Sequence, residues 1–118
     1  MAIYTKKGDE GQTSLFSGER VSKADLRIHT LGNLDELTSH LGKIKTITSE
    51  GRVKKDIERI QNNLIKLMAV VASKEGETLD FPMNETAWVE GRIDLYSKEY
   101  MHPNRFILPG ENIVSAQV

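Results

Sequence analysis

The amino-acid sequence predicts an all-α fold, an up-and-down helical bundle that follows an ordered, glycine-rich loop. Apolar residues recur at steps of three and four in three separate segments, which is the spacing of amphipathic helices. Glycine, serine and threonine are instead concentrated in the first 20 residues, a composition typical of loops. The 118 residues suffice for one core, so we assign the loop (residues 1–21) and the bundle (residues 22–118) to a single domain, 1–118.

Residues 1–20 have the composition of a polar loop that contains the parts of an anion site. The glycines permit tight backbone turns, so that successive amides can approach one phosphate. Hydroxyls and lysines of the string YTKKGDEGQTS, with Arg20 and Lys23 beyond it, supply the other groups that such a site needs. The Walker A spacing GxxxxGK[ST] is absent, so these residues alone leave an ordinary surface turn open as the alternative.

The first helix is expected to begin after a cap at Ser22, with Asp25 at its third position. Its apolar positions then recur along one face. They are Leu31, Leu34, Leu37, Leu41, Ile44 and Ile47. Gly32 predicts an interruption or a bend within this helix, and the stretch 49–51 predicts its end.

The second helix shows the most regular spacing, alternating steps of four and three without a slip. This pattern is typical of an a/d seam between packed helices. The seam residues are Val53, Ile57, Ile60, Leu64, Leu67 and Val71. Within 64–72 only Lys66 is charged, so we expect this half to be surrounded by several helices or by another subunit.

A polar stretch at 74–82 leads to Asn84, which we expect to cap a third helix. The apolar positions of that helix are Val89, Ile93, Tyr96 and Tyr100. Pro103 is expected to end it, because proline cannot continue a helical hydrogen-bond ladder. After a turn at Pro109, residues 113–118 are expected to open a further helix.

The charge balance and the rare residue types exclude several classes of protein. The 16 lysines and arginines nearly cancel the 17 aspartates and glutamates, so no strong positive field favours nucleic acid or an anionic membrane surface. The chain has no cysteine, and His29, His40 and His102 lie far apart, so no metal site is predicted. No apolar run reaches the roughly 20 residues of a membrane span, and no signal-peptide pattern is present. We therefore expect a soluble protein of the cytoplasm.

Residues 3–42 carry a long and specific pattern, IYTKKGDEGQTSLFSGERVSKADLRIHTLGNLDELTSHLG. This segment resembles the signature of the PduO-type ATP:cob(I)alamin adenosyltransferases, in which IYTKxGDxGxTSL is followed by GxRVxKxDxR and GxxDELxSxxG. The resemblance continues through IERIQNNL at 57–64, RID at 92–94 and FILPG at 106–110. It covers essentially the whole chain and differs from the family pattern after Gly110, where glutamate replaces a usual glycine.

The resemblance implies a five-helix, ferritin-like bundle that assembles as a homotrimer, with active sites between subunits. In the family, the next elements are a helix with an Arg-Arg-Ala-Glu-Arg run and a last helix with an Asn-Arg-Leu-Ser-Asp run. Neither run occurs in these 118 residues. The chain is thus expected to represent the N-terminal two-thirds of the family fold, with a bundle that is truncated at the C-terminus.

The implied reaction is transfer of the 5′-deoxyadenosyl group from ATP to cob(I)alamin, which forms adenosylcobalamin and releases triphosphate. Its small molecules are ATP, Mg2+ and cob(I)alamin as the substrate. Cobalt is the nucleophile, so the protein has to hold ATP in line and stabilise charge on the departing phosphates. By resemblance, the ATP-binding residues are Thr5, Lys6, Lys7, Gly8, Thr13, Ser14 and Lys23.

Three further residues have both a functional and a purely structural interpretation. By resemblance, Asp35 pairs with an arginine of the neighbouring subunit. Phe106, by the same resemblance, covers the lower face of the corrin and excludes the axial ligand, which makes cobalt four-coordinate and easier to reduce. As bare sequence, Asp35 would be an exposed helix carboxylate and Phe106 a core residue. Asp9 is a carboxylate near the expected phosphates, or simply a turn residue.

Two other functions remain open at this stage. One is a nucleotide- or corrinoid-binding module without turnover, which the missing arginine-rich helix would explain. The other is a helical assembly protein that uses the a/d seam for partner helices. ATP binding without alkylation would select the first, and no binding of either ligand would select the second.

Overall fold

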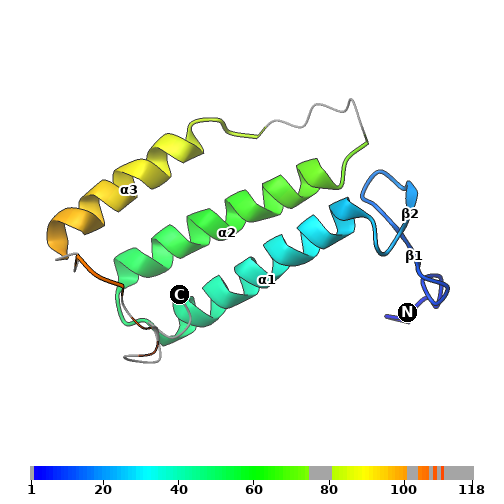
Figure 1. The fold of residues 1–118 in the computed structure, drawn as a ribbon, viewed down its shortest axis with the longest axis horizontal. Coiled ribbons are helices and arrows are strands. Elements are labelled where there is room, and N and C mark those ends of the chain that lie inside the picture. The colour runs from blue at the N-terminus through cyan, green and yellow to red at the C-terminus, as the bar shows by residue number, and fades with distance from the viewer. Residues whose placement is uncertain (1, 75–80, 101–103, 107, 109, 111–118) are drawn as a thin grey trace.

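The computed structural model describes residues 2–74, 81–100, 104–106, 108 and 110, and these form a small hairpin followed by helices (Figure 1). In chain order the elements are β1 (Gln12–Ser14), β2 (Arg20–Ser22), α1 (Leu26–Ile47), α2 (Gly51–Val71) and α3 (Glu85–Glu99). The all-α class is confirmed, with the two short strands as a minor addition. The helix expected at 113–118, the stop at Pro103 and the turn at Pro109 lie outside the described residues.

The sequence predicted that the N-terminal segment is a loop throughout. This is only partly right, because β1 and β2 pair as an antiparallel hairpin. Thr13 lies opposite Val21, and β-branched residues favour extended backbone. Gly18 adopts a φ of 84°, which lets the connection turn back so that its amide donates to the Leu15 carbonyl at 2.9 Å. The prediction missed these strands because three residues are too few to show an alternating pattern.

Helix α1 begins at Leu26, and its N-cap is Asp25 rather than the predicted Ser22. The Asp25 carboxylate accepts a hydrogen bond from the Arg27 amide at 2.8 Å, which satisfies one free N–H of the first turn. Ser22 is the last residue of β2 and accepts from the Ala24 amide at 3.1 Å, so it caps the turn before the helix. The helix continues through Gly32 without interruption.

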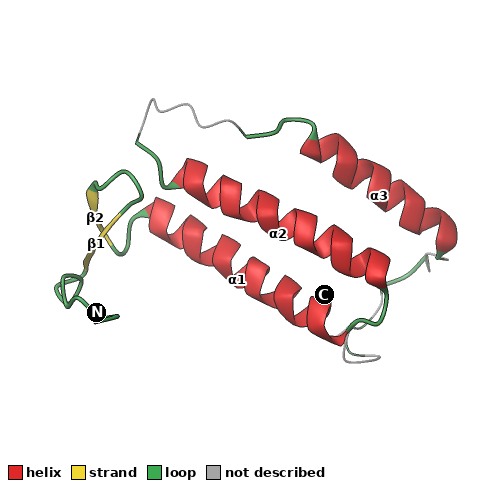
Figure 2. Cartoon of the chain, turned by 180° about the vertical axis from the view of Figure 1, so that it is seen from behind, coloured by secondary structure: helices red, strands yellow, loops and turns green. Residues whose placement is uncertain are grey.

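Helices α1 and α2 form the closely packed pair of the fold. A three-residue connection reverses the chain between them, and Figure 2 shows them side by side along their length. Ile44 of α1 and the seam residues Ile57 and Leu64 of α2 are buried. Their burial confirms that the seam marks the face of α2 that packs against a neighbouring helix. The Gln61 amide joins the two helices, donating to the Thr38 carbonyl and accepting from the Lys45 ammonium, both at 3.1 Å.

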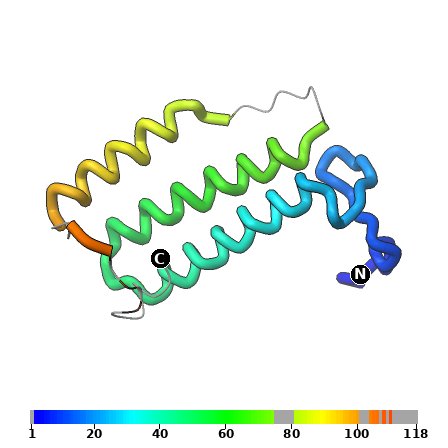
Figure 3. The backbone as a smooth tube through the Cα atoms, in the orientation of Figure 1, coloured from blue at the N-terminus to red at the C-terminus, as the bar shows by residue number. Residues whose placement is uncertain are grey.

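Helix α3 lies beside α2 on the side away from α1 (Figure 3) and is attached through long polar and aromatic side chains. Asn84 precedes it as predicted, but its side chain makes no capping hydrogen bond. A gap of about 160 Å³ remains between the apolar side chains of the two helices, lined in part by Leu64, Leu67 and Val89. Side-chain bridges therefore contribute more to the α2–α3 contact than close apolar packing does.

One bridge between these helices centres on Glu85, in the first turn of α3. Its carboxylate accepts from the Arg59 guanidinium at 2.8 and 2.9 Å and from the Asn63 amide at 2.6 Å. The Arg59 guanidinium also lies 4.2 Å from the centre of the Trp88 ring, within reach of a cation–π contact. The hydrogen bonds from Arg59 and Asn63 lower the pKa of Glu85 from 4.5 to about 2.

A second bridge centres on Asp56 of α2. Its carboxylate accepts from Arg92 at 2.8 Å and from the Tyr96 hydroxyl at 2.7 Å. Burial, together with the hydrogen bond to Asp56, raises the pKa of the Tyr96 hydroxyl. Arg52 adds an ion pair to Glu99 and lies 4.9 Å from the centre of the Tyr96 ring. Ion pairs thus join α2 and α3 at both ends of α3.

Several apolar side chains on the helices are left uncovered by the described residues. Ile65 is 56% exposed and Val70 is 36% exposed, although both belong to the half of α2 that we expected to be surrounded. Leu37 of α1 and Ile93 of α3 are exposed as well. None of the described helices has the combination of length and apolar character that crossing a membrane requires.

The Glu85 bridge predicts a pH-dependent difference in stability. Because its folded pKa lies below the unfolded value, Glu85 stabilises the fold above about pH 5, and this contribution is lost as the pH falls from about 4.5 towards 2. Glu85→Gln should therefore lower the urea midpoint at pH 7 and approach the parent chain near pH 2. Glu90→Gln, an exposed change on the same helix, is the control. A gap between parent and Glu85→Gln that stays constant from pH 7 to pH 2 would contradict this role.

Candidate functional site

The segment before β1 forms a tight turn that carries most of the predicted ATP-binding residues. Lys6 has a φ of 60°, a left-handed conformation that costs a non-glycine residue about 1 kcal/mol. Two backbone hydrogen bonds close the turn. The Asp9 amide donates to the Lys6 carbonyl at 3.4 Å, and the Gly11 amide donates to the Gly8 carbonyl at 3.2 Å. Gly11 has a φ of 84°, and its carbonyl accepts from the Lys23 amide at 2.8 Å. The hairpin therefore holds the end of the turn.

Gly8 and Lys23, which are distant in the sequence, meet in this site. A methyl group at Gly8 would lie 3.1 Å from the Lys23 ammonium nitrogen and 3.1 Å from the Gln12 carbonyl. Both distances are shorter than ordinary contacts, so glycine at this position allows Lys23 to approach the turn. The structure thereby brings two of the predicted residues together through the hairpin.

A pocket of about 560 Å³ opens beside the turn. It is lined by Lys6, Lys7, Asp9, Glu10, Gln12 and Arg20. Three cations and two carboxylates thus face one space, a set that can hold a polyphosphate and a divalent cation bound to it. Among the described residues, no group of three or more histidine, cysteine, aspartate or glutamate side chains could by itself hold a metal ion.

Arg20 is a site residue that the predicted ATP-binding set omitted. Its guanidinium donates to the Lys7 carbonyl at 2.8 Å and to the Ser14 hydroxyl at 3.2 Å. The signal that identifies it is the strand register, which places Arg20 directly opposite Ser14. Since the sequence did not predict the hairpin, it could not predict this pairing.

The other predicted residues lie at the edge of the pocket or away from it. The Thr5 hydroxyl accepts from the Lys7 amide at 3.4 Å, so it shapes the turn. Thr13 is half-buried in β1 and does not line the pocket. Asp35 is exposed on α1, and within the described residues its carboxylate has no hydrogen bond or ion pair. Phe106 is fully exposed, so in this structure it is not the core residue that its sequence alone would suggest.

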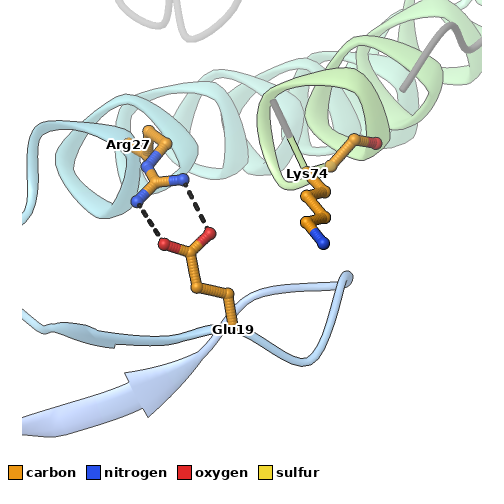
Figure 4. Close-up of a pocket in the computed structure, with 4 residues that line it drawn as sticks. Glu19, Arg27 and Lys74 are labelled. Carbon is orange, nitrogen blue, oxygen red and sulfur yellow. Dashed lines mark hydrogen bonds and ion pairs between the residues drawn. The ribbon is translucent and has the colours of Figure 1, made fainter. Parts of the chain in front are cut away.

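Among the described residues, Arg27 and a backbone hydrogen bond attach the hairpin to the helices. Figure 4 shows the Arg27 guanidinium facing the Glu19 carboxylate. A guanidinium nitrogen lies 3.2 Å from a carboxylate oxygen. The same guanidinium bonds Asp25 and lowers the pKa of that carboxyl. The Ser17 amide donates to the carbonyl of Ala72, just after α2, at 3.3 Å. These contacts fix the site at the end of the bundle where α1 begins and α2 ends.

Comparisons with known proteins agree with the predicted family. The family model described as cobalamin adenosyltransferase matches residues 3–118. A corrinoid adenosyltransferase of Citrobacter freundii is 32% identical and is aligned over 98% of this chain and 68% of its own length. The corrinoid adenosyltransferase PduO of Salmonella typhimurium is 35% identical over 93% of this chain, but only 34% of that protein is covered. The chain thus spans between about a third and two thirds of the length of these relatives.

Solved structures show the same architecture. A variant PduO-type adenosyltransferase from Lactobacillus reuteri complexed with ATP has a TM-score of 0.87 and 31% identity, covering 98% of this chain and 67% of that one. Another variant of the enzyme, complexed with cobalamin and ATP, has a TM-score of 0.86 and 30% identity, with the same coverage. On the family match and on these relatives, the chain belongs to the cobalamin adenosyltransferase family.

Proposed function

We propose that the chain transfers the 5′-deoxyadenosyl group of ATP to cob(I)alamin, forming adenosylcobalamin and triphosphate. The observation that carries this proposal is one glycine-containing turn whose Lys6 and Lys7 line an open pocket and whose Gly8 lies beside the Lys23 ammonium. The relatives named above support it, since one was solved with ATP and another with cobalamin and ATP.

In the proposed reaction, the chain's residues bind and orient ATP while the substrate supplies the nucleophile. Cob(I)alamin donates an electron pair to the 5′ carbon of the ribose, the bond from that carbon to the phosphate oxygen breaks, and the pair leaves on triphosphate. The ammonium groups of Lys6, Lys7 and Lys23 stabilise the charge that collects there. Thr5, Gly8, Thr13 and Ser14 belong to the proposed ATP-binding set as well.

Mg2+ is proposed to enter with the triphosphate as part of the substrate. The pocket fits such a complex, because Asp9 and Glu10 line it beside the cations and carboxylate oxygens are preferred Mg2+ ligands. Cob(I)alamin is a strongly reduced species, so a reducing compartment, the cytoplasm, is the location that we propose.

The corrin and the subunit contact are proposed to involve residues outside the ATP pocket. Phe106 is proposed to lie against the lower face of the corrin, and its full exposure leaves the ring free for such a contact. Asp35 is proposed to pair across a subunit boundary in a homotrimer. Its exposed carboxylate, without a partner in the described part of the chain, supports this proposal.

The function is tested by following cob(I)alamin optically with the 118-residue chain and ATP. We expect ATP-dependent conversion to adenosylcobalamin, and Lys23→Ala should weaken ATP binding about ten- to a hundredfold, the worth of one charge-assisted contact. Lys54→Ala, which removes an exposed cation from α2, is the matched control. ATP binding without conversion would instead favour the binding module, and equal affinity in the Lys23 variant would remove that residue from the site.

The proposed role of Phe106 predicts that its replacement changes the cob(II)alamin spectrum but not the stability of the fold. Phe106→Ala should change the free energy of unfolding by less than about 0.5 kcal/mol, because the ring is exposed. The variant should still bind ATP and cobalamin, but lose the four-coordinate cob(II)alamin signal when an axial ligand returns to cobalt. Melting temperature and spectrum are measured on one sample. A large loss of melting temperature, or an unchanged four-coordinate signal, would rule out the corrin-facing role.

The subunit proposal predicts that the chain associates with itself. The exposed apolar side chains of α1 and α2, among them Leu37, Ile65 and Val70, are of the kind that subunit contacts cover. Sedimentation velocity at micromolar concentration should show a discrete trimer. A stable, non-aggregating monomer under the same conditions would contradict an intersubunit site.

A further inference from the structure

We propose that Arg20 is a positioning residue, which fixes the turn of residues 5–11 in the shape that receives the triphosphate. This inference rests on the proposed function, because that function makes the turn the ATP site. Arg20 lines the pocket, yet its two hydrogen bonds in the structure go to the protein itself.

Arg20 connects three parts of the site. It projects from β2, bonds the Ser14 hydroxyl of β1 at 3.2 Å, and reaches the Lys7 carbonyl in the turn at 2.8 Å. The backbone bond from the Lys23 amide to the Gly11 carbonyl holds only the end of the turn. Arg20 holds its middle, next to the residue with the left-handed backbone, Lys6.

The turn has few strong contacts of its own. The Asp9 amide lies 3.4 Å from the Lys6 carbonyl, and the Lys7 amide lies 3.4 Å from the Thr5 hydroxyl. Bonds of that length are weak, whereas the 2.8 Å bond from Arg20 is short and charge-assisted. Without it, the left-handed backbone at Lys6 would lose its strongest side-chain support.

The shape of the guanidinium, and not only its charge, accounts for this role. The planar fork presents donors in a fixed geometry, so that Arg20 reaches Lys7 and Ser14 at once. Lysine would keep the charge, but its ammonium is a compact point charge on a flexible stem, and its three rotatable donors lack the fixed geometry of the fork. Arg20→Lys therefore removes the fork that holds the turn but keeps the positive charge that attracts phosphate. Arg20→Gln removes both the fork and the charge.

The first measurement is amide hydrogen exchange without nucleotide. In Arg20→Lys and Arg20→Gln, exchange across residues 5–11 should accelerate about tenfold, the loss equivalent to one charge-assisted bond, while α1 and α2 keep parent rates. Lys54→Ala should match the parent chain throughout. Parent-like exchange at 5–11 in Arg20→Lys would overturn the inference, whatever happens to ATP.

The second measurement is the kinetics of cob(I)alamin conversion at varied ATP. A turn that has to be ordered on binding raises the cost of binding, so KM for ATP should rise about tenfold in both variants, with kcat changed less than twofold. A fall in kcat at unchanged KM, or a normal KM in Arg20→Lys, would contradict positioning. If the parent chain itself neither binds nor converts ATP, the proposed function fails, and the exchange data alone decide whether Arg20 holds the turn.

Discussion

The guanidinium of Arg27 is the contact on which the geometry of the site depends. It lies between Asp25, which starts α1, and Glu19, at the end of the hairpin connection, and so joins the first helix to the N-terminal segment. The hairpin contributes few apolar residues to the fold, with Leu15 and Val21 buried. Exposed ion pairs are individually weak, but a guanidinium shared by two carboxylates also fixes the orientation of the two segments that carry them. The turn that we propose to bind phosphate is held to the bundle through this hairpin.

The helical bundle and the N-terminal segment are stabilised by different interactions. The bundle needs burial, which Ile44, Ile57 and Leu64 provide at the α1–α2 contact. The N-terminal segment needs a fixed, polar, concave backbone, which apolar packing cannot supply at this size. It obtains rigidity from short hydrogen bonds, from the left-handed glycine Gly11 and from a strand pair three residues long. The proposed phosphate site thus forms beside the core and not within it.

The sequence predicted the helices well, because their apolar periodicity reflects the same burial that the structure shows at Ile57 and Leu64. It predicted the cap wrongly, since Ser22 and Asp25 both suit an N-cap and only the backbone decides between them. The sequence named Arg20 among the cations beside the glycine-rich string, but it could not predict the pairing with Ser14, because that pairing depends on a strand register that no local pattern reveals. The assignments of Asp35 and Phe106 came from family resemblance, and the partners expected for them are not part of this single chain, so the assignments stay predictions.

Because ion pairs attach α3 to α2, dissolved salt affects the unfolding of α3 more than that of α1 and α2. The contacts of α3 to α2 run through Glu85, Asp56 and Glu99, each paired with an arginine, and a gap of about 160 Å³ remains between the apolar side chains of the two helices. Dissolved ions screen such pairs, whereas an excluded salt such as sodium sulfate strengthens the apolar α1–α2 contact. Rising ionic strength would therefore release α3 as a separate cooperative unit before the rest unfolds, so the chain melts by segments in concentrated salt.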